Sequence, residues 1–322
     1  MKGLKKLLVC LLLCLGLFVC VGCGEKGVVV GILQTATHSA LDDAKDGFIE
    51  ELKANGYEDA EFVVKNPEGD PNTMNSMATE LIRKSDIVLG IGTPAAVALQ
   101  GARDAEQIDV VILFTAVTDP VGGGLMADAS KPTDITGTND MNPVADQVDL
   151  IIELCPGITK LGVLYNVAEP NSLVQAEMVK TQAATKGVEV VVKTVAEAIE
   201  ISAQTTALIQ NEGVQAIYLP TDNLIAANMP AVAAVADELG VPTVCGESGM
   251  VAAGGTITYS INYKSLGVLT GEMAVKILDG TPCSQVPSSS VDASGLEVAI
   301  NEESIKKLGI TVPQSIKDKL NK

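Results

Sequence analysis

The stretch Gly31-Ile32-Leu33-Gln34 has a counterpart further along the chain in Gly162-Val163-Leu164-Tyr165-Asn166. Each is a short aliphatic run that ends on polar residues. Runs of this length and composition are typical of strands buried on both faces, as in a parallel sheet that is covered by helices. Because the two runs match, we expect two copies of one structural unit.

Further strands and helices alternate around these runs. Strands are expected at 27–33, 60–65, 86–91, 110–114, 160–165, 188–192, 216–219, 243–245 and 256–260. Helix-length segments lie between most of them, for example at 41–55, 73–84, 172–186 and 197–211. More paired segments keep the same order, namely Glu61–Lys65 with Glu189–Lys193, Asp86–Thr93 with Gln215–Thr221, and Asp109–Thr115 with Val241–Gly246. This alternation predicts an α/β fold with parallel sheets.

The fold class that follows is α/β, with two similar doubly wound parallel-sheet lobes, a multi-strand hinge and a ligand cleft between the lobes. A chain of 322 residues is long enough for two cores. We expect residues 1–22 to be a signal peptide, 23–140 with about 249–284 to form lobe 1, and 141–248 with about 285–322 to form lobe 2. A strand at Thr256–Tyr263 and a helix at Gly267–Gly280 are expected to return the chain to lobe 1.

The N-terminal segment has the features of an export signal. Three lysines precede an apolar run over residues 7–21, which is short for a membrane span. The run ends on Cys20-Val21-Gly22-Cys23, which resembles a bacterial lipobox, where a small residue precedes the cysteine that receives diacylglycerol. We therefore expect Cys23 to become the lipidated N-terminus, with ordinary signal cleavage and a free thiol as the alternative.

Charge and cysteine usage exclude several functions. The formal charge of −18 becomes −21 without the leader, which holds three lysines and no acid. Such a chain repels phosphate backbones, so no nucleic-acid partner is expected. After Cys23 the cysteines number three, Cys155, Cys245 and Cys283, so a disulfide framework is not indicated. Without metal-ligand spacing or accompanying histidines, no metal or other cofactor is expected either.

Polar residues follow the predicted strands of both lobes. Parallel α/β sheets bind ligands at the carboxyl ends of their strands, where helix N-termini present free N–H groups. The candidate ligand-binding residues are therefore Gln34, His38, Thr93, Thr115, Ala116, Asn166, Asp222 and Glu247.

These strand ends also carry a family resemblance. The segments concerned are His38-Ser39-Ala40-Leu41-Asp42, Thr93-Pro94-Ala95-Ala96, Phe114–Pro120, Thr136-Gly137-Thr138-Asn139-Asp140-Met141, Gly162–Asn166 and Pro220–Asn223. Through them the chain, from about Val30 to Ile310, resembles the ABC-transporter substrate-binding lipoproteins of the tryptophan/tyrosine-binding type. The resemblance implies a two-lobe binding protein that captures amino acids, often aromatic ones.

The segment Gly90-Ile91-Gly92-Thr93-Pro94-Ala95 matches a dinucleotide-binding fingerprint. The acidic residue that should end the next strand is missing, because Phe114-Thr115 stands there. The segment fits a helix start better, with Thr93 as N-cap and Pro94 at the first helical position. Its hydroxyl and free N–H groups suit a carboxylate, and a plain helix cap is the alternative.

The remaining candidates each have two possible roles. Asp222 suits a ligand ammonium, or it caps the following helix. Glu247 is the second candidate for the ammonium, or a solvated hinge carboxylate. His38 is a cleft-wall residue or a structural one, and Tyr165 or Tyr263 stacks on a ring or packs in the core.

Within the loop Thr115–Pro120 we expect Thr115 and Ala116 to contact ligand rather than Asp119, which with Pro120 forms a common turn. Catalytic groups are scarce. The chain has one histidine, and Gly246-Glu247-Ser248-Gly249-Met250 lacks the last glycine of a nucleophile elbow.

The sequence therefore predicts an extracytoplasmic solute-binding lipoprotein, anchored to the cell membrane by Cys23, that closes over an amino acid and delivers it to ABC permease subunits. Aromatic amino acids are favoured by the resemblance. A sensing or adhesin lipoprotein with the same fold is the first alternative, and an NAD-dependent enzyme a weaker one, so no enzyme is expected.

Overall fold

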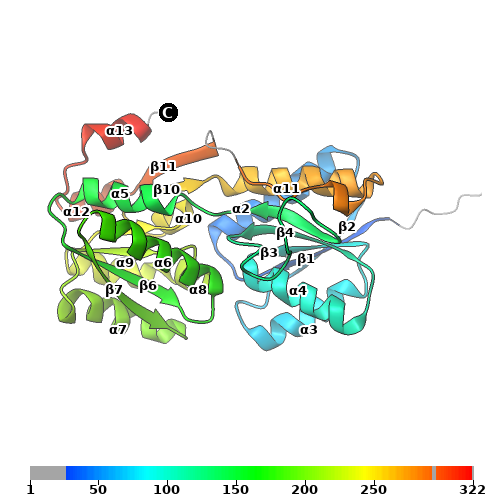
Figure 1. Cartoon of the computed structure of the whole chain (residues 1–322), viewed down its shortest axis with the longest axis horizontal. Helices are drawn as coiled ribbons and strands as arrows, with labels where there is room; N and C mark the ends of the chain where they lie inside the picture. Colours follow the sequence, from blue (N-terminus) through cyan, green and yellow to red (C-terminus); the bar gives the residue numbers. More distant parts are fainter. Residues whose placement is uncertain (1–26, 292–294, 321–322) are drawn as a thin grey trace, which may run out of the picture.

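The computed structural model describes residues 27–291 and 295–320, which form two α/β lobes side by side (Figure 1). The leader and Cys23, for which the sequence predicts cleavage and lipidation, lie outside these residues.

The first lobe is built on five parallel strands in the order β2-β1-β3-β4-β5. They are β1 (Val29–Gln34), β2 (Glu61–Lys65), β3 (Ile87–Ile91), β4 (Val111–Val117) and β5 (Ile135–Asn139). The helices of this lobe are α2 (Ser39–Ala54), α3 (Pro71–Ile82), α4 (Thr93–Glu106) and α11 (Tyr263–Leu278). Side chains alternate along each strand, so Ile32 packs with α2 and α11, and Leu33 with α3 and α4. The sheet is thus covered on both faces.

The second lobe has six strands in the order β11-β10-β9-β8-β6-β7, all parallel except β11, which runs antiparallel to β10. They are β6 (Lys160–Asn166), β7 (Glu189–Val195), β8 (Ala216–Leu219), β9 (Thr243–Cys245), β10 (Ile257–Ile261) and β11 (Leu296–Ile300). One face packs on α5 (Val144–Leu154), α6 (Pro170–Thr185) and α13 (Gln314–Leu320). The other packs on α7 (Ile201–Thr206), α8 (Asn223–Ala227), α9 (Met229–Glu238) and α10 (Ser248–Ala252), and α12 (Glu302–Lys307) follows β11.

The predicted alternation of strands and helices and the two-lobe α/β class are confirmed. The predicted assignment of one strand to lobe 1 is wrong. The strand expected to return the chain to lobe 1 is β10, and it pairs with β9 and β11 in the second sheet. The return is made by α11, which packs along α2 because Gly267 has no Cβ to collide with the backbone of Ala44. The domain limits as such stay a prediction.

The hinge lies where the chain crosses between the lobes after β5, after β10 and before β11 (Figure 1). Asn142 ties the first two crossings together. Its Oδ1 accepts from the Ile261 N–H at 2.9 Å, and its Nδ2 donates to the Asp140 carbonyl at 3.1 Å. The segments that follow β3 and β4 in one lobe, and β8 and β9 in the other, meet across the cleft beside this hinge.

Candidate functional site

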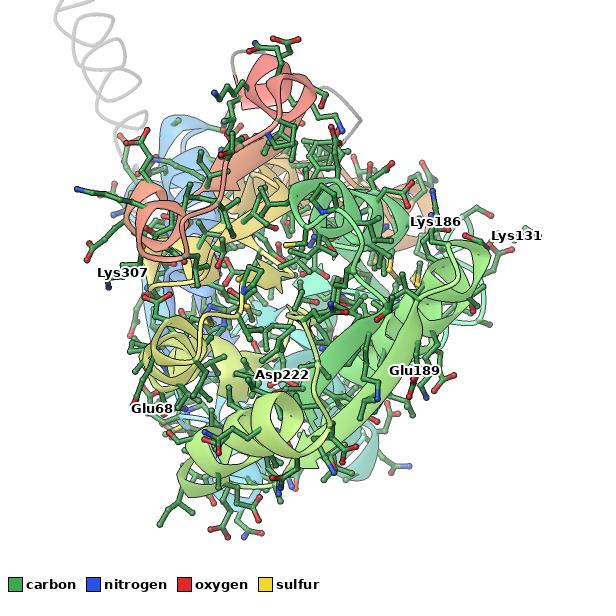
Figure 2. The ribbon with its side chains drawn as sticks, turned by 90° about the vertical axis from the view of Figure 1, so that its left-hand side faces the viewer. Glu68, Lys131, Lys186, Glu189, Asp222 and Lys307 are labelled. Atoms are coloured by element: carbon green, nitrogen blue, oxygen red, sulfur yellow. The ribbon has the colours of Figure 1, made fainter. Side chains whose placement is uncertain are left out.

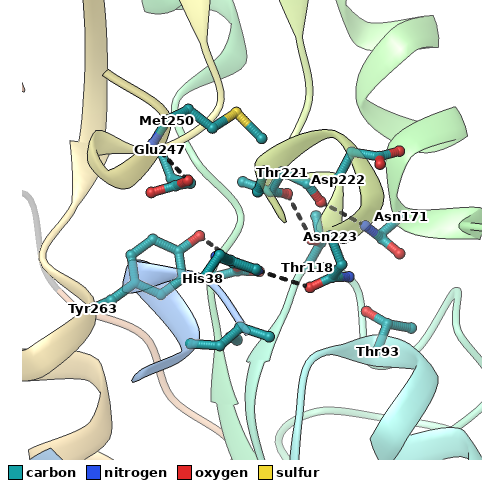
Figure 3. A pocket seen from close by; sticks show the side chains of 14 residues that line it. His38, Thr93, Thr118, Asn171, Thr221, Asp222, Asn223, Glu247, Met250 and Tyr263 are labelled. Carbon is teal, nitrogen blue, oxygen red and sulfur yellow. Dashed lines mark hydrogen bonds between the residues drawn. The ribbon is translucent and has the colours of Figure 1, made fainter. Parts of the chain in front are cut away.

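A small cavity lies between the lobes (Figure 3). Lobe 1 contributes His38, Leu41, Thr93, Ala116, Thr118 and Tyr263, and the crossing segment contributes Asp140. Lobe 2 contributes Asn171, Thr221, Asp222, Asn223, Ala226, Glu247 and Met250. A ligand in this cavity therefore touches both lobes.

The N-terminus of α4 forms one part of the wall. Gly92, with φ of 89°, is the N-cap, so Thr93 occupies the first helical position instead of the cap that the sequence predicts. A Cβ at position 92 would also meet the Thr35 hydroxyl at 2.6 Å. Thr93 Oγ1 is buried and has no hydrogen-bond partner among the described residues. With the unpaired N–H groups of a helix start, it makes a site for an anionic oxygen.

Ala116 lies beside this helix start in an unusual conformation. Its φ is 55°, at the point where the pairing of β4 with β5 shifts register between Phe114 and Val117. A non-glycine residue in the left-handed region is uncommon. The bulge places Ala116 at the cavity wall.

Asp140 differs from the other acids of the cavity in how its two carboxylate oxygens are bonded. Its Oδ2 accepts a hydrogen bond from the Tyr263 hydroxyl at 2.6 Å, and its Oδ1 is buried with no partner among the described residues. Burial raises the pKa of Asp140, although the hydroxyls of Tyr263 and Thr118 favour its charged form. A buried carboxylate oxygen without a donor is costly, so this position calls for a cationic partner.

Glu247 is the second acid at the wall. It caps α10, and its carboxylate accepts from the N–H groups of Gly249 and, at 2.9 Å, of Met250. Burial raises its pKa to about 7, and the charge of nearby Asp140 adds to the effect. Figure 3 shows Glu247 and Tyr263 on one side of the cavity and Thr93 on the other.

Asp222 also faces the cavity and is buried, but its oxygens are occupied by its own lobe. Oδ1 accepts from Ile225 N at 2.9 Å, which caps α8. Oδ2 accepts from Asn166 N at 2.7 Å and from the Ser172 hydroxyl at 2.8 Å. Burial raises its pKa. These contacts favour the capping role over contact with a ligand ammonium.

The cavity wall thus carries the three carboxyl groups of Asp140, Asp222 and Glu247, and none of the described residues that line it is Lys or Arg. The labelled charges Lys186, Glu189 and Lys307 lie at the surface in Figure 2 and take no part. Burying several acids without a cation is unfavourable, so the arrangement favours a ligand that brings positive charge.

Three predicted site residues lie outside the cavity. Gln34 donates to the Ala36 carbonyl and to Asp42, at 2.8 and 3.0 Å, and so holds the loop after β1. Thr115 bonds the hydroxyl of Thr138 on the neighbouring strand at 3.1 Å. Asn166 gives its backbone N–H to Asp222 and its side chain to the following turn. Of the three, only Asn166 bonds a residue of the cavity wall, Asp222.

His38 lines the cavity and contacts the other lobe. Its Nε2 lies 3.3 Å from Asn223 Oδ1, while Nδ1 is buried without a partner among the described residues. Burial lowers the pKa of His38. The ring is therefore neutral near pH 7.

The candidate ligand-binding residues expected from the sequence do not include Asp140, Thr118 and Asn223, which line the cavity, or Glu169, which bonds Asn223. Asp140 and Thr118 belong to segments that carry the family resemblance, and Asn223 follows a predicted candidate. Glu169 has no such signal. It is buried at the start of α6, and burial together with the charge of Asp222 raises its pKa to about 8.

Comparison with known proteins agrees with this architecture. A family model described as ABC transporter substrate binding protein matches residues 29–321. The chain belongs to this family. It is an ABC transporter substrate-binding protein, and its relatives are binding proteins that work outside the cytoplasmic membrane. In the described part of the chain no helix is long and apolar enough to cross a membrane.

Individual relatives cover nearly the whole chain. It is 35% identical to a tyrosine-binding protein of Clostridioides difficile, over 88% of this chain and 81% of the relative. A Streptococcus pneumoniae ABC domain in complex with L-Trp has a TM-score of 0.85 at 32% identity, covering 91% of this chain and 98% of its own. The ligand-free, open structure of a Clostridium difficile substrate-binding protein with adhesive properties has a TM-score of 0.66 at 35% identity, covering 89% and 96%.

The two TM-scores differ although the identities are similar. The overall structure of this protein is therefore more similar to that of the L-Trp complex than to that of the open form. A sensing or adhesin role for this chain stays a prediction.

Proposed function

We propose that this substrate-binding protein captures an α-amino acid, with an aromatic side chain, in the cavity between its lobes. The proposal rests on one observation: the cavity wall has one part that suits a negative group and another part that suits a positive group. An unpaired hydroxyl and a helix N-terminus suit a carboxylate, and buried acids without Lys or Arg suit an ammonium.

In this proposal the ligand carboxylate accepts hydrogen bonds in lobe 1. Thr93 Oγ1 has no other partner among the described residues, and Thr93 lies at the first position of α4, where backbone N–H groups have no partner within the helix. The bulge at Ala116 adds the end of β4 to the same part of the cavity wall. No basic side chain is needed, because the helix dipole also favours negative charge.

The ammonium binds Asp140 and Glu247. Asp140 Oδ1 has a free acceptor position, and Glu247 comes from the opposite lobe, so one ammonium joins the lobes. This assignment replaces Asp222, the first choice from the sequence, whose two oxygens already accept three hydrogen bonds. Charge-assisted bonds of this kind are about twice as strong as neutral ones.

The ligand side chain packs against the apolar part of the wall. Leu41, Ala226, Met250 and the ring of Tyr263 supply this surface. Thioether and ring contacts suit an aromatic group. The tyrosine-binding relative and the relative solved with L-Trp support the same class of ligand.

Capture proceeds by closure, since ligand contacts on both lobes stabilise the closed form. ABC permease subunits then receive the ligand, and a lipid on Cys23 keeps the protein at the membrane. No catalytic step is part of this function.

A thermal-shift screen of the twenty amino acids, followed by calorimetry with tyrosine, phenylalanine and tryptophan, tests the ligand class. We expect micromolar or tighter binding of an aromatic amino acid, about −8 kcal/mol or more favourable. Binding of a sugar and of no amino acid would refute the proposal. Small-angle scattering should show a smaller radius of gyration with ligand, and mass spectrometry of the mature N-terminus tests lipidation of Cys23.

A further inference from the structure

Two side-chain hydrogen bonds join the lobes across the cleft, among the residues that the structure describes. Thr118 Oγ1 lies 3.3 Å from Thr221 Oγ1, and His38 Nε2 lies 3.3 Å from Asn223 Oδ1 (Figure 3). Both partners on the lobe 2 side belong to one short segment, Thr221–Asn223. The contact between the lobes at the cleft thus depends on how this segment is held.

The segment is braced by buried polar residues at the start of α6. Asn171 Nδ2 donates to the Thr221 carbonyl at 2.8 Å, and Gln175 Oε1 accepts from Thr221 N at 3.0 Å. Glu169 holds Asn223 at two points. Its Oε2 accepts from Asn223 N at 3.0 Å and from Asn223 Nδ2 at 2.6 Å. These side chains are buried although they are polar, which indicates that positioning this segment is their role.

The bond to Glu169 determines how Asn223 meets the other lobe. Since Nδ2 donates to Glu169, Oδ1 is the atom that faces His38, and it can only accept. His38 Nε2 is therefore the donor, and the neutral ring carries its proton there. Nδ1 is then unprotonated, which agrees with its lack of an acceptor among the described residues.

We propose that the chain of hydrogen bonds from Glu169 through Asn223 to His38 is an inter-lobe latch that favours the closed form, with Glu169 as its positioning residue. Glu169 does not line the ligand cavity and acts through Asn223. The inference rests on closure, which is part of the proposed function, but it concerns the balance between the open and closed forms before any ligand binds.

The latch is tested without ligand by disulfide trapping. In a Thr118→Cys/Thr221→Cys reporter, the two thiols replace hydroxyls 3.3 Å apart, so a disulfide forms only when the lobes are closed. Mass spectrometry of the peptide that links 118 to 221 separates this disulfide from products of the native cysteines. The initial rate of its formation reports the closed population.

Asn223→Ala in the reporter background should slow trapping about fivefold, the value of one neutral hydrogen bond. Asn228→Ala is the matched control. Its Nδ2 bonds the Leu224 carbonyl within lobe 2, so this variant should leave the rate unchanged. Glu169→Ala should slow trapping as Asn223→Ala does, and combining the two should add little, because Glu169 acts through Asn223.

The His38 end is tested by rescue. His38→Ala should slow trapping, and His38→Gln, which keeps a side-chain N–H donor, should restore most of the rate. Equal rates in the reporter and in Asn223→Ala would overturn the latch, and so would additive effects of Glu169→Ala and Asn223→Ala. If Glu169→Ala does not fold, the Asn223 and His38 variants decide. Failure of the proposed function is seen separately, as absence of amino-acid binding to the unmodified protein.

Discussion

Replacing Asp140 by Asn should abolish most of the ligand affinity while leaving the ligand-free protein as stable as before. The Asn Oδ1 keeps the hydrogen bond from the Tyr263 hydroxyl, which measures 2.6 Å in the native protein. The change removes the charge and the unpartnered carboxylate oxygen that the ammonium is proposed to meet. It therefore separates ligand binding from folding.

The magnitude follows from the burial of the site. Asp140 is 3 % exposed, so the charge pair is desolvated. Truncating one partner of a buried hydrogen-bonded charge pair costs about 2–5 kcal/mol. At about 1.4 kcal/mol for each factor of ten, affinity should fall by roughly 30-fold to several thousand-fold. Because removing a buried unpaired charge is favourable, the free energy of unfolding without ligand should not decrease.

The assay is titration calorimetry of the wild type and Asp140→Asn with the best ligand from the screen, paired with denaturant unfolding. Asp119→Asn is the matched control, since Asp119 lies in the nearby loop after β4 and accepts hydrogen bonds from the local Val121 and Gly122 N–H groups. It should bind normally. An affinity for Asp140→Asn within threefold of wild type would refute our assignment of the ammonium site.

Thr93→Val keeps the shape of the side chain but removes an unpartnered buried hydroxyl, so the affinity should fall about fivefold without loss of stability in thermal unfolding; unchanged affinity would contradict the carboxylate site. Binding should release protons below pH 7, because the pKa of Glu247 is raised to about 7 and an ammonium favours its ionised form; heats measured in buffers of different ionisation enthalpy should differ, and equal heats would contradict this. The free energy of unfolding without ligand should fall as pH rises from 6.5 to 8, because the neighbouring buried carboxyl groups of Glu169 and Asp222, whose pKa values are both raised, hold a proton in the folded state that the unfolded chain has lost. Urea titrations check this slope, which is clearest above about pH 7, because His38, whose pKa is lowered by burial from 6.5, acts in the opposite sense around and below pH 6.5.

Most of the fold could be predicted because buried parallel strands leave a strong pattern. β8 and β9 were predicted with their observed limits. β5 was missed because its sequence, Ile135–Asn139, is rich in Thr and contains Gly137. Inside the protein its threonines are satisfied, since Thr136 Oγ1 donates to the Val286 carbonyl and Thr138 pairs with Thr270, at 2.6 and 2.7 Å. These hydrogen-bond partners lie far from β5 in the sequence, so the residues of β5 alone do not reveal the strand.

The site could be predicted only as a region. Strand ends identify which loops face the cleft, and five of the eight candidates line the cavity, because parallel strands present their carboxyl ends together. The strand pattern cannot show which acid has a free oxygen. Asp222 and Asp140 both follow strands and line the cavity, yet Asp222 caps a helix, whereas Asp140 has one oxygen without a partner among the described residues. The difference depends on contacts such as Ser172 to Asp222, which tertiary structure alone creates.

The hydrogen bonds between the lobes explain why closure needs a ligand. The two bonds across the cleft, Thr118 to Thr221 and His38 to Asn223, are neutral and contribute about 1 kcal/mol each. Closing the lobes also keeps Asp140 and Glu247 away from water, which is unfavourable without a cation. The latch opposes this cost, and in the proposed function the charge-assisted bonds of the ammonium shift the balance to the closed form. A stronger latch would close the protein without ligand and would reduce the difference between forms that a permease recognises.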